Sequence, residues 1–194
     1  MAKVLLIVDA QNDFCEGGKL PVNGAKARML NLAKYVEETN GKYETIILTA
    51  DWHPSSHCSF TENGGTWPQH CVQYSEGAAI VKEVLDAANK CNMQILTKGN
   101  LENKEEYSIV DNALNGEFLV STLSHKNIVS VDVCGIVSEI CVLSTIKGLV
   151  EKGLKDKINV LIPYCAPLDA DFENPNGKAL IAYCKENGLS MIEE

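Results

Sequence analysis

The stretch from Asn127 to Ser144 constrains the fold most, because it reads as a buried strand that continues through a turn into a helix. Residues 128–133 are mostly apolar and β-branched, which is typical of a strand buried on both faces of a parallel sheet. Gly135 permits a tight turn, and Ser138 is expected to cap a helix that continues through Leu149. The sequence therefore predicts a strand–turn–helix unit here.

Cys141 falls in the first turn of this expected helix. There its sulfur would lie near unpaired backbone N–H groups and the positive end of the helix dipole. Such a site lowers the pKa of a thiol from about 8.5 towards or below neutrality and favours the nucleophilic thiolate. The alternative, that Cys141 only fills the core, is not decided by this stretch alone.

Short apolar segments alternate with helical periodicity along the rest of the chain. Strands are expected at residues 4–8, 45–50, 94–97, 159–162 and 189–192, and helices at residues 23–39, 78–89, 116–124 and 177–187. This alternation predicts βαβ units, and hence an α/β three-layer sandwich whose mostly parallel sheet of about six strands carries helices on both faces. A length of 194 residues predicts a single domain over residues 1–194.

Charge and cysteine content narrow the class of protein. The net charge of −9 argues against nucleic acid or an anionic membrane as a partner. The first apolar run, Val4 to Val8, is too short for a signal peptide or a membrane span, so we expect a cytoplasmic protein. None of the eight cysteines forms a C-x-x-C pair, and most are expected to be free thiols.

Ionisable or nucleophilic residues follow four strands in succession. Asp9, Asp51 and Lys98 end the first three strands, and the turn that leads to Cys141 ends the fourth. In parallel sheets, ligands bind beyond the carboxyl ends of the strands. Asp9 could take the proton of the thiol and Lys98 could stabilise the thiolate, while the backbone N–H groups around Val137 and Cys141 could receive a developing oxyanion. A purely structural ion pair of Asp9 with Lys98 is the alternative.

A second group of polar residues lies in the long segment after Asp51. His53, His57 and His70 all fall within it. A carboxylate and two imidazoles, here Asp51, His53 and His70, leave positions open on a divalent ion, as in catalytic metal sites. Zn²⁺ is the expected ion, with Fe²⁺ or Mn²⁺ as alternatives, and a contribution from His57 is left open.

Loop aromatics flank these groups. Phe14, Trp52 and Trp67 either seal the core or sandwich a flat ring near the metal.

Six short motifs between Asp9 and Val142 carry a further signal. They are Val8 to Phe14 with Gly17-Gly18, Asp51 to Pro54 with His57 to Phe60, Trp67 to Cys71, Thr97-Lys98-Gly99, Tyr107-Ser108, and Val131 to Gly135 with Cys141-Val142. Together they resemble the nicotinamidases of the isochorismatase-like cysteine hydrolases. The resemblance covers most of the chain and implies the isochorismatase-like hydrolase fold.

The resemblance also implies a role for each matching residue. Cys141 would be the nucleophile, Asp9 its base and Lys98 the third catalytic member. The peptide bond between Ile136 and Val137 would be cis, with the N–H groups of Val137 and Cys141 forming the oxyanion hole. The metal ligands would be Asp51, His53 and His70. The substrate ring would be surrounded by Phe14, Trp67 and Tyr107.

The expected activity is the deamidation of nicotinamide to nicotinate and ammonia through a thioester, in NAD salvage. The resemblance further implies a small-molecule substrate and a homo-oligomer. One alternative is a related hydrolase that acts on another small amide, a carbamoyl compound or isochorismate. Another is a metal or redox protein without catalytic activity.

Overall fold

Six parallel strands form the centre of the computed structural model, which describes residues 1–39, 41–171 and 173–193. The strands are β1 (Ala2–Val8), β2 (Thr45–Asp51), β3 (Met93–Lys98), β4 (Ile128–Ile136), β5 (Ile158–Ala166) and β6 (Ser190–Ile192). Their order in the sheet is β3-β2-β1-β4-β5-β6, so β1 lies between β2 and β4. The predicted parallel sheet of about six strands is confirmed.

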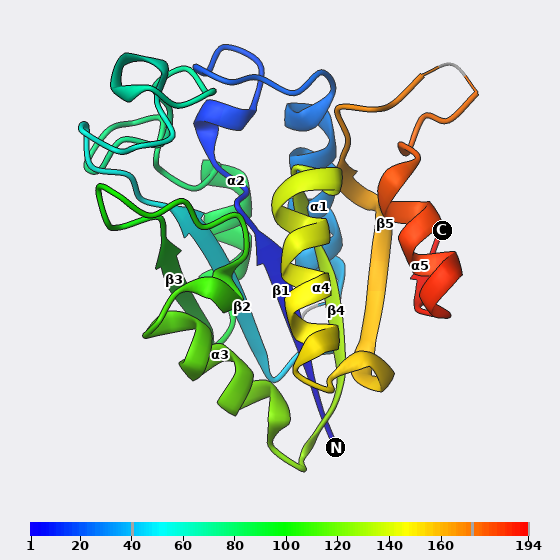
Figure 1. Cartoon of the computed structure of the whole chain (residues 1–194). Coiled ribbons are helices and arrows are strands. Elements are labelled where there is room, and N and C mark those ends of the chain that lie inside the picture. The colour runs from blue at the N-terminus through cyan, green and yellow to red at the C-terminus, as the bar shows by residue number, and fades with distance from the viewer. Residues whose placement is uncertain (40, 172, 194) are drawn as a thin grey trace.

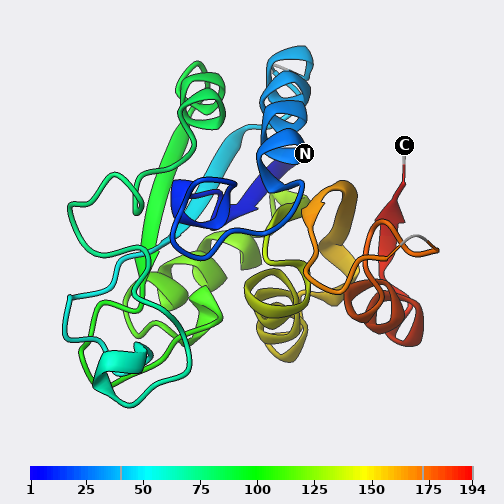
Figure 2. The same ribbon diagram turned by 90° about the horizontal axis from the view of Figure 1, so that it is seen from above.

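Five α-helices in the described residues cover the two faces of the sheet. They are α1 (Ala25–Glu38), α2 (Lys82–Ala88), α3 (Asn115–Ser124), α4 (Leu143–Glu151) and α5 (Ala179–Asn187). Helices α1 and α2 lie on one face, and α3, α4 and α5 lie on the other (Figures 1 and 2). The result is the expected three-layer sandwich. None of the helices in the described ranges is long and apolar enough to cross a membrane.

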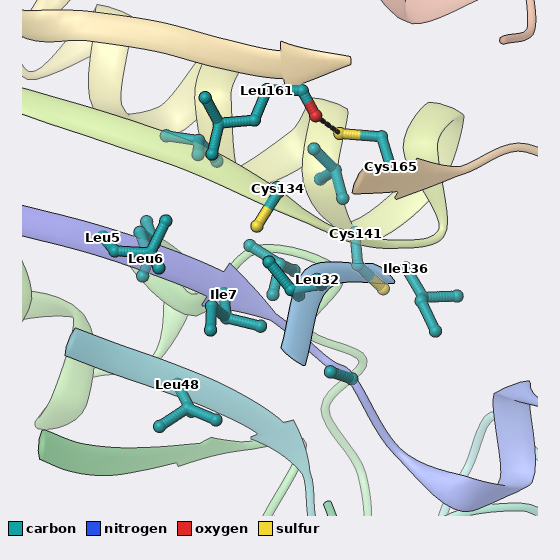
Figure 3. Close-up of a cluster of buried hydrophobic side chains, with 14 of the residues drawn as sticks. Leu5, Leu6, Ile7, Leu32, Leu48, Cys134, Ile136, Cys141, Leu161 and Cys165 are labelled. Carbon is teal, nitrogen blue, oxygen red and sulfur yellow. Dashed lines mark hydrogen bonds between the residues drawn. The ribbon is translucent and has the colours of Figure 1, made fainter. Parts of the chain in front are cut away.

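The core explains why the central strands are so apolar. Leu5, Leu6 and Ile7 of β1 are fully buried because helices cover both faces of this strand. Figure 3 shows them beside Leu48 of β2 and Cys134 of β4. The sheet is therefore a rigid support for the residues at its carboxyl edge.

The helix expected at residues 78–89 is shorter than predicted, because α2 begins only at Lys82. The residues before it are extended and pair with the chain just after β1. Gln11 and Ile80 form an antiparallel bridge, and the Val81 N–H donates to the Ala10 carbonyl. These backbone contacts with a distant segment override the local helical preference.

Two details of the strand–turn–helix prediction are wrong. Gly135 is not in a turn but within β4, with φ of +131°, and a Cβ there would lie 2.0 Å from the Val8 carbonyl oxygen. Its role is to permit the close approach of β1. Ser138 is not the cap, because Val137 occupies the capping position and the buried Ser138 hydroxyl has no hydrogen-bond partner among the described residues. The helix instead starts with a π-helical turn, Ser138–Val142, that continues into α4.

Candidate active site

A pocket lies at the carboxyl edge of the sheet, uppermost in Figure 1. The space inside it is about 460 Å³ when the open solvent at its mouth is included. Its lining residues are Phe14, Leu20, Val22, Asp51, His53, Trp67, His70, Glu105, Tyr107, Val137, Ile140, Cys141 and Leu168. Most of them come from loops that follow the strands, as expected for a parallel sheet.

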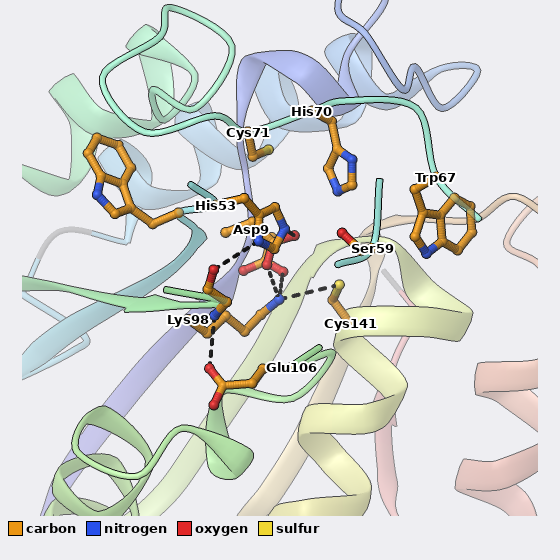
Figure 4. Close-up of polar contacts among 12 residues, drawn as sticks. Asp9, His53, Ser59, Trp67, His70, Cys71, Lys98, Glu106 and Cys141 are labelled. Atoms are coloured by element: carbon orange, nitrogen blue, oxygen red, sulfur yellow. Dashed lines mark hydrogen bonds and ion pairs between the residues drawn. The ribbon is translucent and has the colours of Figure 1, made fainter. Parts of the chain in front are cut away.

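Cys141, Lys98 and Asp9 come together at the floor of this pocket (Figure 4). The Lys98 ammonium lies 3.7 Å from the Cys141 sulfur and 2.9 Å from Asp9 Oδ2. Asp9 is held from the other side by the Thr49 hydroxyl, which donates to Oδ1 at 2.6 Å. Cys141 faces the pocket, whereas Asp9 and Lys98 are fully buried. The three residues predicted from the strand ends are therefore within mutual reach.

The Cys141 thiol does not have the lowered pKa that was expected from the start of a helix. Burial raises the pKa of Cys141 well above the ordinary value, and the nearby Lys98 charge offsets this only in part. Burial also raises the pKa of Asp9, again against the attraction of Lys98. A carboxylate with a raised pKa is a stronger base, so it accepts the proton of a thiol more readily than a carboxylate with an ordinary pKa does. The resting site thus favours a neutral thiol beside a proton acceptor.

Asp51 connects this group to the two histidines. Its Oδ1 lies 2.5 Å from the Lys98 ammonium, and its Oδ2 lies 3.7 Å from His53 Nε2. Burial opposes its ionisation, but the charges and hydrogen bonds of Lys98 and His53 together outweigh burial and hold the pKa of Asp51 well below its usual range. Asp51 is therefore a carboxylate in the folded protein.

The donor atoms of Asp51, His53 and His70 fit a divalent ion. Nδ1 of His53 faces the Gly99 carbonyl at 3.0 Å, and Nδ1 of His70 faces the Pro68 carbonyl at 2.8 Å. Because a carbonyl only accepts, each Nδ1 carries the proton and each Nε2 keeps its lone pair, as is usual for metal-binding histidines. Ligand atoms of Asp51, His53 and His70 lie within 4.8 Å of one another.

The pKa values of the two imidazoles are shifted in opposite directions. Burial lowers the pKa of His53, but the hydrogen bond and charge of Asp51 outweigh it, so the net pKa of His53 is raised. Burial lowers the pKa of His70.

His57 fits a structural role better than a ligand role. Its Nε2 faces the Lys104 carbonyl at 3.0 Å, and its Nδ1 lies 2.7 Å from the Ser59 hydroxyl. With Nε2 protonated by this pairing, Nδ1 accepts from Ser59, so both ring nitrogens are engaged. The ring packs on His53 with a centroid distance of 4.1 Å. His57 therefore packs against His53 and has no lone pair left for an ion.

Phe14, Trp67 and Tyr107 line the pocket as expected, but Trp52 does not; its ring instead packs against Tyr74 with a centroid distance of 5.3 Å. The Trp67 indole N–H donates to the Tyr107 hydroxyl at 3.0 Å, which joins two loops across the mouth. Phe14 is buried and its ring centroid lies 5.6 Å from that of His70. Val137 lines the pocket beside Cys141, and the Ile136–Val137 peptide bond is cis, as the resemblance implies.

Two supporting residues were missed by sequence reasoning. Gln11 exchanges hydrogen bonds with the backbone N–H and C=O of Asp51, both at 2.8 Å, and so fixes the end of β2. Glu106 accepts from the Gly99 N–H at 2.8 Å and so holds the loop that contacts His53. Gln11 lies in the motif from Val8 to Phe14, which could have indicated its role, but Glu106 lies in a charged stretch with no distinguishing pattern.

The fold and this site define a class of protein. The family model "Isochorismatase domain" matches residues 3–162. The chain belongs to the isochorismatase family.

Within that family the chain is similar to proteins named as nicotinamidases. It is 34% identical over 173 residues to the nicotinamidase/pyrazinamidase of Mycobacterium tuberculosis, a match that covers 87% of this chain and 89% of the relative. It is 28% identical over 198 residues to the nicotinamidase of Saccharomyces cerevisiae, covering 88% and 91%, respectively.

Solved structures give the same picture. The pyrazinamidase of Pyrococcus horikoshii in complex with zinc matches with a TM-score of 0.80 and 28% identity, and all of both chains is covered. The yeast nicotinamidase bound to the inhibitor nicotinaldehyde matches with a TM-score of 0.85 and 26% identity, covering 99% of this chain and 100% of the other.

Proposed function

We propose that this protein is a nicotinamidase, which hydrolyses nicotinamide to nicotinate and ammonia through a thioester on Cys141. The observation that carries the proposal is the position of the Cys141 sulfur, 3.7 Å from Lys98 and beside Asp9, on the floor of a pocket whose wall carries Asp51, His53 and His70. The names of the relatives support the same substrate.

The first half of the reaction forms the acyl-enzyme. Asp9 takes the thiol proton of Cys141, and the sulfur attacks the carbonyl carbon of the amide. The carbonyl oxygen becomes an oxyanion that accepts hydrogen bonds from the N–H groups of Val137 and Cys141. Lys98 stabilises the negative charge that moves between Asp9 and the sulfur. The C–N bond then breaks, and the nitrogen leaves as ammonia with the proton from Asp9.

The second half releases the acid. Asp9 takes a proton from a water molecule, whose oxygen attacks the thioester carbon. The C–S bond breaks, nicotinic acid forms, and the proton on Asp9 returns to the sulfur of Cys141. One water is consumed and one ammonia is released in each cycle.

Three pocket residues would hold a metal ion, and three aromatic residues would hold the substrate ring. A divalent ion bound by Asp51, His53 and His70 supplies a positive charge that binds and polarises the pyridine nitrogen. We propose Zn²⁺, with Fe²⁺ or Mn²⁺ as alternatives, because the donor set is nitrogen and oxygen and a related structure is a zinc complex. The ring would lie between Phe14 and Trp67, with Tyr107 at the mouth.

Removal of the nucleophile tests the proposal. We expect Cys141→Ala to release no ammonia from nicotinamide above background, because no other cysteine of the described residues lines the pocket. The matched control is Cys91→Ala, which removes a thiol just before the opposite end of β3 and should keep wild-type turnover. A colorimetric or coupled ammonia assay measures both, and turnover by Cys141→Ala would refute the proposed nucleophile.

Pyrazinamide is a second candidate substrate, since one relative is named nicotinamidase/pyrazinamidase. Its ring has the shape of the nicotinamide ring, and both rings carry a nitrogen meta to the carbon that bears the amide.

Two expectations from the sequence are retained as proposals. We propose that the chain forms a homo-oligomer and acts in the cytoplasm. The resemblance to the family supports the first, and cysteines that form no disulfide in the described residues are compatible with the second.

A further inference from the structure

One wall of the pocket comes from the loop that connects β5 to α5. Leu168 lies two residues after the end of β5 and lines the pocket together with Ile140. Its side chain is 51% exposed, so it lies at the mouth and not at the floor. No motif in the sequence had connected this leucine to the site.

Glu139 holds Leu168 in this position. Its Oε1 accepts from the Leu168 N–H at 2.7 Å and from the Asp169 N–H at 2.8 Å. Glu139 belongs to the π-helical turn that carries Cys141, so the carboxylate joins the nucleophile's own turn directly to the pocket wall. One acceptor that engages two successive N–H groups fixes both peptide units.

The acceptor role of Glu139 does not depend on its charge. Its second oxygen, Oε2, is buried and has no hydrogen-bond partner among the described residues. Burial, aided by the charge of Asp169, raises the pKa of Glu139. A glutamine at this position would keep a carbonyl oxygen for the same two N–H groups, whereas an alanine would not.

The far end of the loop is anchored independently of Glu139. Asp169 Oδ2 accepts from the N–H groups of Lys178 and Ala179, at 3.0 and 2.9 Å, at the start of α5. Arg28 donates to the Pro175 carbonyl at 2.7 Å. Loss of the Glu139 carboxylate would therefore release Leu168 without detaching the rest of the loop.

We propose that Leu168, positioned by Glu139, is a specificity-determining residue that limits substituents on the substrate ring. This inference rests on the proposed function. If the ring nitrogen faces Asp51 and His53 and the amide at carbon 3 faces Cys141, carbon 5 is the ring atom that points away from both. A methyl group on carbon 5 would then meet Leu168 at the mouth. The preferred substrates are thus six-membered heteroaromatic carboxamides without a substituent at carbon 5.

The test compares nicotinamide with 5-methylnicotinamide as substrates of the 194-residue chain. The ratio of kcat/KM for the methylated over the plain amide should rise about tenfold or more in Leu168→Ala, because one methyl group in an apolar pocket changes discrimination by about 10–200-fold. Glu139→Ala should raise the ratio in the same direction, and Glu139→Gln should keep the wild-type ratio. Leu114→Ala, which truncates an exposed leucine beside α3, is the matched control and should also keep it.

A second readout does not depend on the amidase reaction. The rates at which iodoacetamide and the bulkier N-phenyl iodoacetamide modify Cys141 can be followed by peptide mass spectrometry. The bulky-to-small rate ratio should rise in Leu168→Ala and in Glu139→Ala. Unchanged ratios in Leu168→Ala would overturn the role of Leu168, and a Glu139→Gln variant that behaves like Glu139→Ala would overturn the acceptor role of Glu139. If the wild-type protein releases no ammonia from nicotinamide, the proposed function fails, and the alkylation ratios alone decide this inference.

Discussion

Lys98 places a full positive charge where water does not reach. Its ammonium contacts carboxylate oxygens of both Asp9 and Asp51, and the strong attraction keeps the pKa of Lys98 well above its ordinary value although burial alone would lower it. Two buried carboxylates so close together could not both stay ionised without this cation. Lys98 is therefore the residue on which the charge balance of the site depends.

At the residue scale, Lys98→Met should cost both activity and stability. Removal of one partner from a buried charge cluster destabilises proteins by about 3–5 kcal/mol, since the remaining charges are left uncompensated. Urea unfolding at neutral pH measures the loss. The control is Lys82→Met at an exposed position of α2, where a change within about 0.5 kcal/mol is expected. Equal stability of Lys98→Met and wild type would show that the cluster contributes nothing to folding.

Two glycines show how an element depends on its neighbour. Gly135 in β4 and Gly153 after α4 both have positive φ, +131° and +79°. A Cβ at Gly135 would lie 2.0 Å from the backbone of Val8, whereas a Cβ at Gly153 would meet no atom of the described residues within 4 Å. The positive φ alone therefore does not determine how much the addition of a side chain at a glycine would destabilise the protein.

At the element scale, Gly135→Ala should be far more damaging than Gly153→Ala. Gly153→Ala carries only the conformational cost, about 1–2 kcal/mol. Gly135→Ala must also separate β1 from β4, and we expect a loss above about 4 kcal/mol or no folded protein. Thermal unfolding followed by circular dichroism separates the two, and similar melting temperatures would contradict the close packing of these strands.

Glu106 holds the end of β3 through three donors. It accepts from the Gly99 N–H, from Asn112 Nδ2 at 2.8 Å and from the Lys104 ammonium at 2.7 Å. Burial raises the pKa of Glu106, but these donors outweigh burial and leave it lowered. A lowered carboxyl pKa in the folded state stabilises the protein above the unfolded pKa of about 4.3, and this contribution is lost as the pH falls through the folded value.

Glu106→Gln should therefore cost stability in a pH-dependent way. We expect a loss of about 1–2 kcal/mol at pH 7, because one charged acceptor is replaced by a donor. The difference from wild type should shrink as the pH falls below about 4. Urea unfolding across pH 3.5 to 7 gives the profile, with the exposed Glu117→Gln as control. A difference that does not vary with pH would argue against an ionised Glu106.

At the scale of the whole molecule, a metal ion would join β2 to the long loop that follows it. Asp51 ends β2, while His70 lies in a segment held to His53 by backbone hydrogen bonds such as that from the His53 N–H to the Cys71 carbonyl. A ligand that binds only the folded state stabilises it by mass action. We therefore expect the stability of the folded chain to rise when a metal ion binds.

Zinc should accordingly raise the melting temperature. Free Zn²⁺ at 100 times its Kd adds about 2.7 kcal/mol, or about 5–10 °C for a chain of this size. His53→Ala and His70→Ala should lose both the shift and the bound metal, and the exposed His125→Ala should keep both. Calorimetry with and without a chelator, together with elemental analysis, provides the measurement. One equivalent of metal retained by His53→Ala and His70→Ala would refute the ligand set.

The sequence by itself determined the sheet and the residues at its carboxyl edge. A strand buried on both faces must be apolar along its length, so its polar end stands out, as Asp9, Asp51 and Lys98 do. Since parallel strands end at the same edge, the convergence of these residues followed from the alternation of strands and helices alone.

Only the tertiary structure decided how deeply those residues are buried and which distant residues they contact. The raised pKa of Cys141 depends on burial by distant segments, and the role of Gly135 depends on how closely β1 approaches. The contribution of Leu168 depends on a contact with Glu139, 29 positions earlier in the chain. Local sequence patterns report the preferences of neighbouring residues, whereas desolvation and close packing arise between residues that only folding brings together.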